Sequence, residues 1–167
     1  MLKKIALILL LIAPMTVFAQ KFGHIKTQAI ISIMPEYTKA QTDLETMAKQ
    51  YEEEIRRVEN EMQKKFTEYQ QEQATLPKNI QERRQKELQE LNERGMQMQQ
   101  DAAQELEKAK WALYEPILKK IEDAIKAVGQ ESGYVYIFDL DRTYIPFVNE
   151  TLSTDVTDAV KAKLGIK

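Results

Sequence analysis

The sequence predicts an α+β fold, mainly α, in which a long antiparallel helical hairpin is attached to a small β body. Three observations predict it. Between residues 36 and 130 the chain has only two glycines and two prolines and is dense in Glu, Gln, Lys and Arg, the composition of long helices. Apolar residues within this stretch recur at helical spacing. Short runs rich in aromatic and β-branched residues lie on both sides of it, as expected for strands.

The first nineteen residues have the pattern of a secretory signal peptide. Lys3 and Lys4 precede an apolar run at 5–13, so we expect cleavage between Ala19 and Gln20 and a mature chain in the periplasm. The apolar run is too short for a retained anchor, which needs ~20 residues. The chain has no cysteine, which excludes a lipoprotein anchor and disulfides. Cleavage takes the formal net charge from −2 to −4, which argues against nucleic-acid binding.

The arm is expected over residues 36–130, with its tip near 74–78. In its first half the apolar spacing is 3, 4, 4, 3, 4, 4, 3, an eleven-residue repeat that favours straight or slightly right-handed pairing of helices. Pro77 suits the first turn of a second helix. The first stripe comprises Leu44, Met47, Tyr51, Ile55, Val58, Met62, Phe66 and Tyr69, and the second Leu88, Leu91, Met98, Ala102, Leu106, Ala109, Leu113, Ile117, Ile121, Ala124 and Val128.

Two arms of this length would extend roughly 60 and 75 Å at 1.5 Å per residue. Because two helices bury only their common seam, much of the hairpin must face solvent, a partner or an enclosed space. Pro116 interrupts the backbone hydrogen bonding of the second helix and is a candidate hinge. Gly95 costs about 1 kcal/mol relative to alanine, and either flexibility or close packing against the other arm would explain it.

The body is expected from residues 20–35 together with 131–167. We predict strands at 21–26, 134–138 and 143–148, a short helix before Pro35, and a last helix within 153–165 that stops at Gly165. Simple alternation would put Tyr134, Tyr136 and Phe138 on one face of their strand. Three strands cannot cover both faces, so other copies of the chain are expected to do so. The predicted oligomerisation residues are Phe22, Ile25, Tyr134, Tyr136, Ile137, Phe138, Ile145 and Phe147.

The segment Asp139-Leu140-Asp141-Arg142-Thr143 matches the D-x-D-x-T pattern with which dehalogenase-type phosphatases present a nucleophilic aspartate. Only 24 residues follow Thr143, and a helical hairpin precedes it, so the sheet that such an enzyme requires has no room. The alternative is a turn between strands, because Asp bonds readily to its own backbone. We interpret the segment as a turn.

The sequence also lacks the usual motifs of metal and nucleotide sites. His24 is the only histidine and no cysteine is present, so we interpret it as a strand residue and not as a metal ligand. No phosphate-binding glycine loop occurs. The sequence therefore predicts a protein that is not an enzyme and uses no cofactor and no metal.

Three segments together resemble the Skp/OmpH family of periplasmic chaperones. They are FGHIKTQAIISIMPEY (22–37), YEPILKKIEDAIKAVGQESGYVYIFD (114–139) and DVTDAVKAKLG (155–165), and with the hairpin between them they span the mature chain. The resemblance implies a homotrimer in which short strands of three chains close a small barrel. It also implies that three arms surround a cavity that holds unfolded outer-membrane proteins without ATP.

Contact with such clients would be diffuse, because methionine and aromatic side chains along the arms suit promiscuous binding. The candidate contact residues are Met62, Phe66, Tyr69, Met96 and Met98. A local basic excess at the tip, Lys78, Arg83, Arg84 and Lys86, would permit weak contact with a membrane surface. Well-known family members are strongly basic and this chain is not, which leaves binding of anionic lipid open.

The alternative function is that of a structural or adaptor coiled-coil protein of the cell envelope. Such adaptors flank their hairpin with sizeable β domains, whereas this chain has only 20–35 and 131–167 outside the arm.

Overall fold

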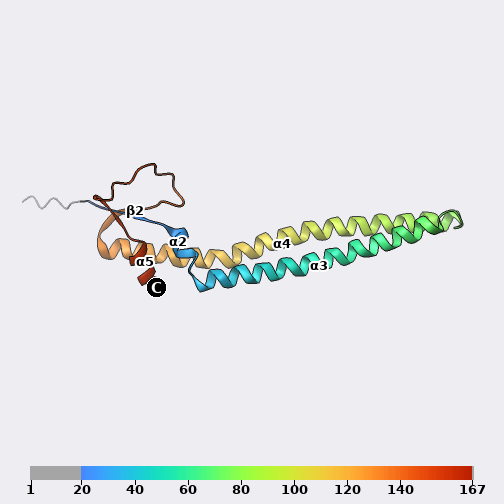
Figure 1. Cartoon of the computed structure of the whole chain (residues 1–167), viewed down its shortest axis with the longest axis horizontal. Coiled ribbons are helices and arrows are strands. Elements are labelled where there is room, and N and C mark those ends of the chain that lie inside the picture. The colour runs from blue at the N-terminus through green and yellow to red at the C-terminus, as the bar shows by residue number, and fades with distance from the viewer. Residues whose placement is uncertain (1–19, 167) are drawn as a thin grey trace, which may run out of the picture.

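A computed structural model describes residues 20–166, so the predicted signal peptide at 1–19 lies outside the described residues. Figure 1 shows a long two-helix hairpin with a small body at one end. This confirms the mainly helical α+β fold with its hairpin arm and small β body. The elements in chain order are β1 (Lys21–Ile25), α2 (Thr27–Ile31), α3 (Pro35–Glu72), α4 (Lys78–Ser132), β2 (Tyr134–Asp139), β3 (Ser153–Asp155) and α5 (Thr157–Leu164).

The two long helices pack along the seam that the apolar stripes predict. All residues of both stripes are buried or half-buried except Phe66, which is 43% exposed. Gly95 lies in this seam, where an added Cβ would be 3.8 Å from Val58 Cγ1, so its position favours the packing interpretation. Residues 73–77 connect the helices, and Gln81 closes the turn by donating to the carbonyls of Gln73 and Leu76, each at 2.9 Å.

Helix ends follow local chemistry. Pro35 occupies the first turn of α3, where its missing N–H removes no helical hydrogen bond. Helices α4 and α5 end at Gly133 (φ 70°) and Gly165 (φ 72°), left-handed positions that favour glycine. Within residues 20–166, no helix has both the length and the apolar character needed to cross a bilayer.

The body is built around a three-stranded sheet in the order β2-β1-β3, with both pairings parallel. The connection from β1 to β2 and the connection from β2 to β3 cross the sheet in opposite directions. Because crossovers between parallel strands are right-handed, the two connections must lie on opposite faces of the sheet. The helices cover the face that bears Gly23 and Ile137. The loop at 140–152 lies against the other face, beside Phe22 and His24.

The core lies between the sheet and the last third of α4. Its most deeply buried side chains come from both ends of the chain, Ile25, Ile30, Met34, Val156 and Val160. They pack with Ile117, Ile121, Ala124 and Val128 of α4. The body therefore holds the base of the arm as part of its own core.

The predicted strand at 143–148 is wrong. This segment is irregular, and the third strand is the short β3, which the sequence analysis had assigned to the last helix. The loop must cross the face of the sheet from β2 to reach the far side of β1, and Pro146 in its middle cannot donate a ladder hydrogen bond. Tyr144 and Phe147 are left 92% and 77% exposed. Helix α5 accordingly begins only at Thr157.

The predicted alternation of side chains along β2 is also wrong. The pairing register shifts from Lys21–Tyr134 to Phe22–Tyr136, which leaves Val135 as an extra residue, a β-bulge. Tyr134 therefore packs against the core with Ile137, whereas Tyr136 is on the other face with Phe138. The rings are neighbours along that face: Phe22 and Tyr136 are stacked with centroids 6.4 Å apart, and Tyr136 and Phe138 are tilted with centroids 5.8 Å apart.

Gly23→Val is expected to destabilise the body by about 1–3 kcal/mol, the usual cost of overpacking. A Cβ at this position would approach Ile137, Tyr134 and Val156 at 3.2–3.3 Å, and a valine adds two further methyl groups. Urea unfolding followed by circular dichroism measures the change.

Gly95→Ala is the matched control for that substitution, because its Cβ meets only an ordinary contact in the seam. It should stabilise α4 by up to about 1 kcal/mol. Equal stability of the wild type and the Gly23→Val variant would show that the sheet has space there.

Candidate functional site

The face of the sheet away from α4 carries three aromatic side chains, which we call the aromatic face: the half-buried Phe22 and the exposed Tyr136 and Phe138. Tyr136 is 60% exposed and Phe138 43%. A cavity of about 360 Å³ lies between this face and the loop, lined mainly by apolar side chains that include Ile145 and Phe147. Such a contiguous apolar surface is typical of a contact with another chain.

The predicted oligomerisation residues therefore fall into two groups. Phe22, Tyr136, Phe138, Ile145 and Phe147 lie on or beside the aromatic face. Ile25, Tyr134 and Ile137 pack against the protein's own core instead.

His24 is a buried strand residue, as predicted. Its Nδ1 is 2.9 Å from Ser153 Oγ, and its Nε2 is 3.9 Å from Asp155 Oδ2. Burial raises the pKa of Asp155, but hydrogen bonds from the Thr157 hydroxyl and N–H, helped by His24 and Lys26, outweigh it and lower the pKa overall. Among the described side chains, no three His, Cys, Asp or Glu residues gather as a metal site.

The D-x-D-x-T segment forms a turn, which confirms the structural interpretation. Asp139 Oδ1 accepts the Asp141 N–H at 3.0 Å, and its Oδ2 accepts the Thr27 hydroxyl at 2.7 Å. Asp141 Oδ2 accepts the Gln28 N–H at 2.7 Å, in the first turn of α2. Both carboxylates thus tie the turn to α2.

The predicted client-contact residues differ in exposure. Met96 is 57% exposed and Phe66 43%, whereas Met62 and Met98 are half-buried. Tyr69 is only 7% exposed, and its hydroxyl accepts a hydrogen bond of 2.7 Å from Gln85 Nε2, so in this structure it belongs to the seam.

The apolar stripes do not predict a role for Trp111, the only tryptophan, which is 61% exposed on α4. It stands two residues from each of the seam residues Ala109 and Leu113, and this spacing places it on the side of the helix away from α3. This position, about half a turn out of phase with the apolar stripe, was the signal available in the sequence. Seam periodicity does not point to a residue on the opposite face of the helix.

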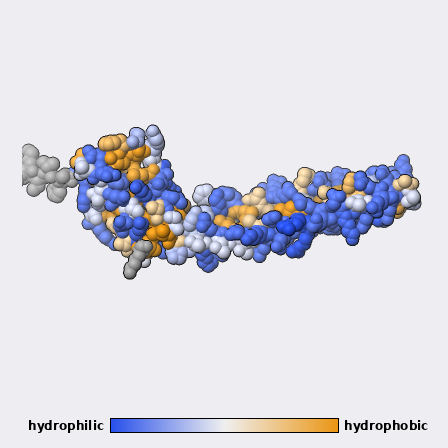
Figure 2. All heavy atoms as spheres, viewed as in Figure 1, coloured by the Kyte–Doolittle hydropathy of each residue, from blue (hydrophilic) through white to orange (hydrophobic). Residues whose placement is uncertain are grey.

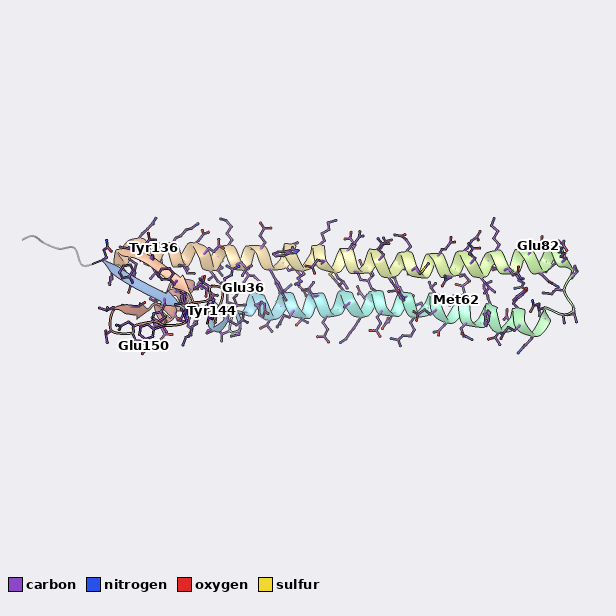
Figure 3. The ribbon with its side chains drawn as sticks, turned by 90° about the horizontal axis from the view of Figure 1, so that it is seen from above. Glu36, Met62, Glu82, Tyr136, Tyr144 and Glu150 are labelled. Atoms are coloured by element: carbon purple, nitrogen blue, oxygen red, sulfur yellow. The ribbon has the colours of Figure 1, made fainter. Side chains whose placement is uncertain are left out.

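Figure 3 places Glu36 at the junction of arm and body, Met62 along α3 and Glu82 at the tip. Figure 2 shows the arm as mainly hydrophilic, with apolar surface concentrated in patches. At the tip, Arg84 lies 4.0 Å from Glu72 and Lys86 lies 3.7 Å from Glu90. Lys78 and Arg83 are exposed.

The candidate hinge, Pro116, lies within a helix that continues on both sides of it. Around it, Lys120 Nζ donates to Glu36 Oε1 at 2.6 Å, and the rings of Tyr37 and Tyr114 are 5.3 Å apart. A cavity of about 280 Å³ lies between the start of α3 and α4, with Pro116 in its lining. At the junction of arm and body, α3 and α4 are thus joined by an ion pair and an aromatic pair beside this cavity.

These features define a hairpin-armed protein with a small parallel-sheet body that carries an apolar, partly exposed face. The family model described as "Outer membrane protein (OmpH-like)" matches residues 21–164. The chain therefore belongs to the OmpH-like family, which confirms the resemblance.

A crystal structure of a protein from Caulobacter crescentus CB15, proposed to be an outer membrane chaperone (OmpH-like), shares the fold. The TM-score is 0.72 at 16% identity, over 87% of this chain and 83% of that chain. A comparison with curated protein sequences finds no match.

We expect the arm to lose stability as the pH falls below about 4.5, the ordinary pKa of a glutamate. Hydrogen bonds from Lys65 and Lys120 lower the pKa of Glu87 and of Glu36, respectively, and both pairs link α3 to α4. A lowered folded-state pKa stabilises the protein above the unfolded value, and that contribution disappears as the carboxylate is protonated. Thermal melts between about pH 7 and about pH 3 measure it.

Glu87→Gln should lower Tm at neutral pH and reduce the drop in acid. Glu90→Gln is the control, because its partner Lys86 lies on the same helix. An unchanged pH profile in Glu87→Gln would show that the pair between the arms contributes nothing.

Proposed function

We propose that this protein is an ATP-independent periplasmic holdase that binds unfolded outer-membrane proteins between helical arms and prevents their aggregation. Membership of the OmpH-like family supports a chaperone role in general. The observation that carries the mechanism is the hairpin itself, whose helices have 38 and 55 residues and, outside the part of α4 that fills the body core, bury little more than the seam between them. The exposed surface of these helices does not stabilise the fold of the chain itself, and it gives room for contact with a large partner of variable sequence.

The body would assemble three copies through the aromatic face. One face of the sheet packs against α4, whereas the other face carries Phe22, Tyr136 and Phe138, and the outer edges of β2 and β3 are unpaired within the described residues. Association would cover Phe22, Tyr136 and Phe138 and fill the cavity under the loop. The arms of a trimer would then project from one body and enclose a common space.

Client contact would be spread over exposed side chains of the arms, chiefly Phe66 and Met96. Many weak contacts let one surface accept many sequences, and unfolded barrel proteins expose the apolar strands most prone to aggregate. Met62, Met98 and Tyr69 would contribute where the seam loosens, and bending at Pro116 would adjust the width of the space.

Lys78, Arg83, Arg84 and Lys86 would give the tip a weak attraction to a membrane surface. Arg84 and Lys86 already lie near carboxylates, so this attraction would be modest. The signal peptide would deliver the chain to the periplasm with cleavage between Ala19 and Gln20.

Phe138→Asp is expected to dissociate the assembly, since burying an unpaired charge in the subunit contact is costly. Size-exclusion chromatography with light scattering measures the mass. Ile33→Asp is the matched control, because Ile33 has nearly the same exposure, 44% against 43%, but lies between α2 and α3. A wild-type protein that is monomeric at micromolar concentration would contradict the trimer.

Deletion of the arm should abolish protection of clients while the body still assembles. The cut must keep the part of α4 that fills the core, so a short linker should join Leu44 to Lys110. This preserves Ile117 and Ile121, which a cut reaching Ile125 would remove. Light scattering of a urea-diluted outer-membrane protein, without nucleotide, compares intact and armless chains at equal concentration.

Equal protection by the armless body would place client binding in the body or in the retained base of α4 and overturn the container mechanism. Binding of one folded partner without suppression of aggregation would favour the adaptor function instead.

A further inference from the structure

A second apolar surface lies at the base of the arm. Trp111, Leu118 and Ile125 are spaced by seven residues on α4, so they lie on one side of the helix with only ~20° of drift per step. This line ends in a crevice of about 410 Å³ between α4, α2 and the end of β2, with Leu118 and Ile125 in its wall. We call Trp111, Leu118, Ile125 and this crevice the base surface.

The base surface is open and combines aliphatic side chains with the polar side chains of Thr27, Asp139 and Thr143. Ile31 and Ile137 form other parts of the crevice wall. Trp111 is 61% exposed, while Leu118 and Ile125 are half-buried. The line spans about 21 Å along the helix, the length of about six residues of extended chain.

Charge around the base surface indicates what it can bind. Just before Trp111 in the sequence, Lys108 lies 3.6 Å from Glu105, and Lys110 lies 3.5 Å from Glu107. At the crevice, Arg142 Nη1 is 3.8 Å from Glu122 Oε1. Each of these cations has a carboxylate beside it, so the surface offers no excess positive charge to a phosphate or an anionic lipid. It suits an uncharged, apolar segment.

The base surface meets the aromatic face at one residue, because Phe138 lines both the crevice and the hollow beside the aromatic face. Trp111 lines neither hollow and lies about 10 Å from Leu118 along α4, toward the tip of the arm. A second copy on the aromatic face would therefore reach the edge of the crevice, whereas the Trp111 end of the base surface lies on the arm, where a client would be held.

We propose that the base surface anchors an extended apolar segment of the unfolded client, with one aliphatic or aromatic side chain in the crevice and another against Trp111. This inference rests on the proposed holdase function and adds a defined anchor to the diffuse contacts of the arms. Trp111 and Leu118 are specificity residues for uncharged, apolar segments.

Trp111 is the only tryptophan, so its fluorescence reports on this surface alone. The experiment adds a urea-unfolded outer-membrane protein, with its own tryptophans replaced by phenylalanine, to the full-length mature chain. Emission should shift to shorter wavelength and become protected from acrylamide. Light scattering of the same samples tests holdase activity separately.

Trp111→Ala and Leu118→Ala should each weaken client binding about 3- to 10-fold, more than a diffuse contact would. Ile33→Ala is the control, an exposed apolar residue outside the base surface, and should leave affinity unchanged. Circular dichroism and the assembly mass, which should stay those of the wild type, separate these effects from misfolding.

Suppressed aggregation with unchanged Trp111 emission would overturn the anchor and leave the holdase function standing. Absent suppression would remove the holdase function and the anchor with it. An emission shift that follows the protein's own concentration without client would assign the surface to a second copy and also overturn the proposal.

Discussion

The structure depends on one constraint, that the central strand of the sheet comes from the beginning of the described chain and both its neighbours from the end. Strand β1 pairs with β2 and β3 on its two sides, and the partners of Phe22, for example, are Tyr136 and Ser153. Neither half of the body is a folding unit alone. Everything between β1 and β2 is therefore an insertion. Because the strands are parallel, the chain leaves β1 at Ile25, beside Asp139, and returns to β2 at Tyr134, beside Lys21, at the other end of the strand pair.

This constraint also fixes the arm. The last third of α4 fills the core beneath the sheet, and Met34 and Ala40 bring the start of α3 into the same core. Beyond this base, most ion pairs on the hairpin join residues three or four apart within one helix and contribute little individually. The two arms are held mainly by a narrow apolar seam, which leaves the rest of their surface for other molecules.

The sequence predicted the arm better than the body, for a physical reason. A pair of long helices can bury only one stripe on each, so residues such as Val58 and Leu91 reveal their neighbours by spacing alone. The sheet has no such redundancy. Ser153–Asp155 has no apolar pattern and is a strand only because β1 offers a free edge. The β-bulge at Val135 puts Tyr134 and Tyr136 on opposite faces of the sheet. The position of this bulge depends on the pairing of β2 with β1, which local sequence does not show. The turn at Asp139 could be predicted because the hydrogen bond that forms it is local, from the Asp141 N–H to the Asp139 side chain. Trp111 could not be predicted in this way because it belongs to neither apolar stripe.

Because the hairpin enters and leaves the body at one place, its length is not coupled to the body's packing. In α3 the seam repeats every eleven residues, and eleven residues are about three full turns of any α-helix, so equal insertions of this length in each arm would return the following side chains to their original faces. Each such pair would move the tip outward by about 16 Å. The length of the arms can thus change in steps of one repeat while residues 20–35 and 131–166 stay the same.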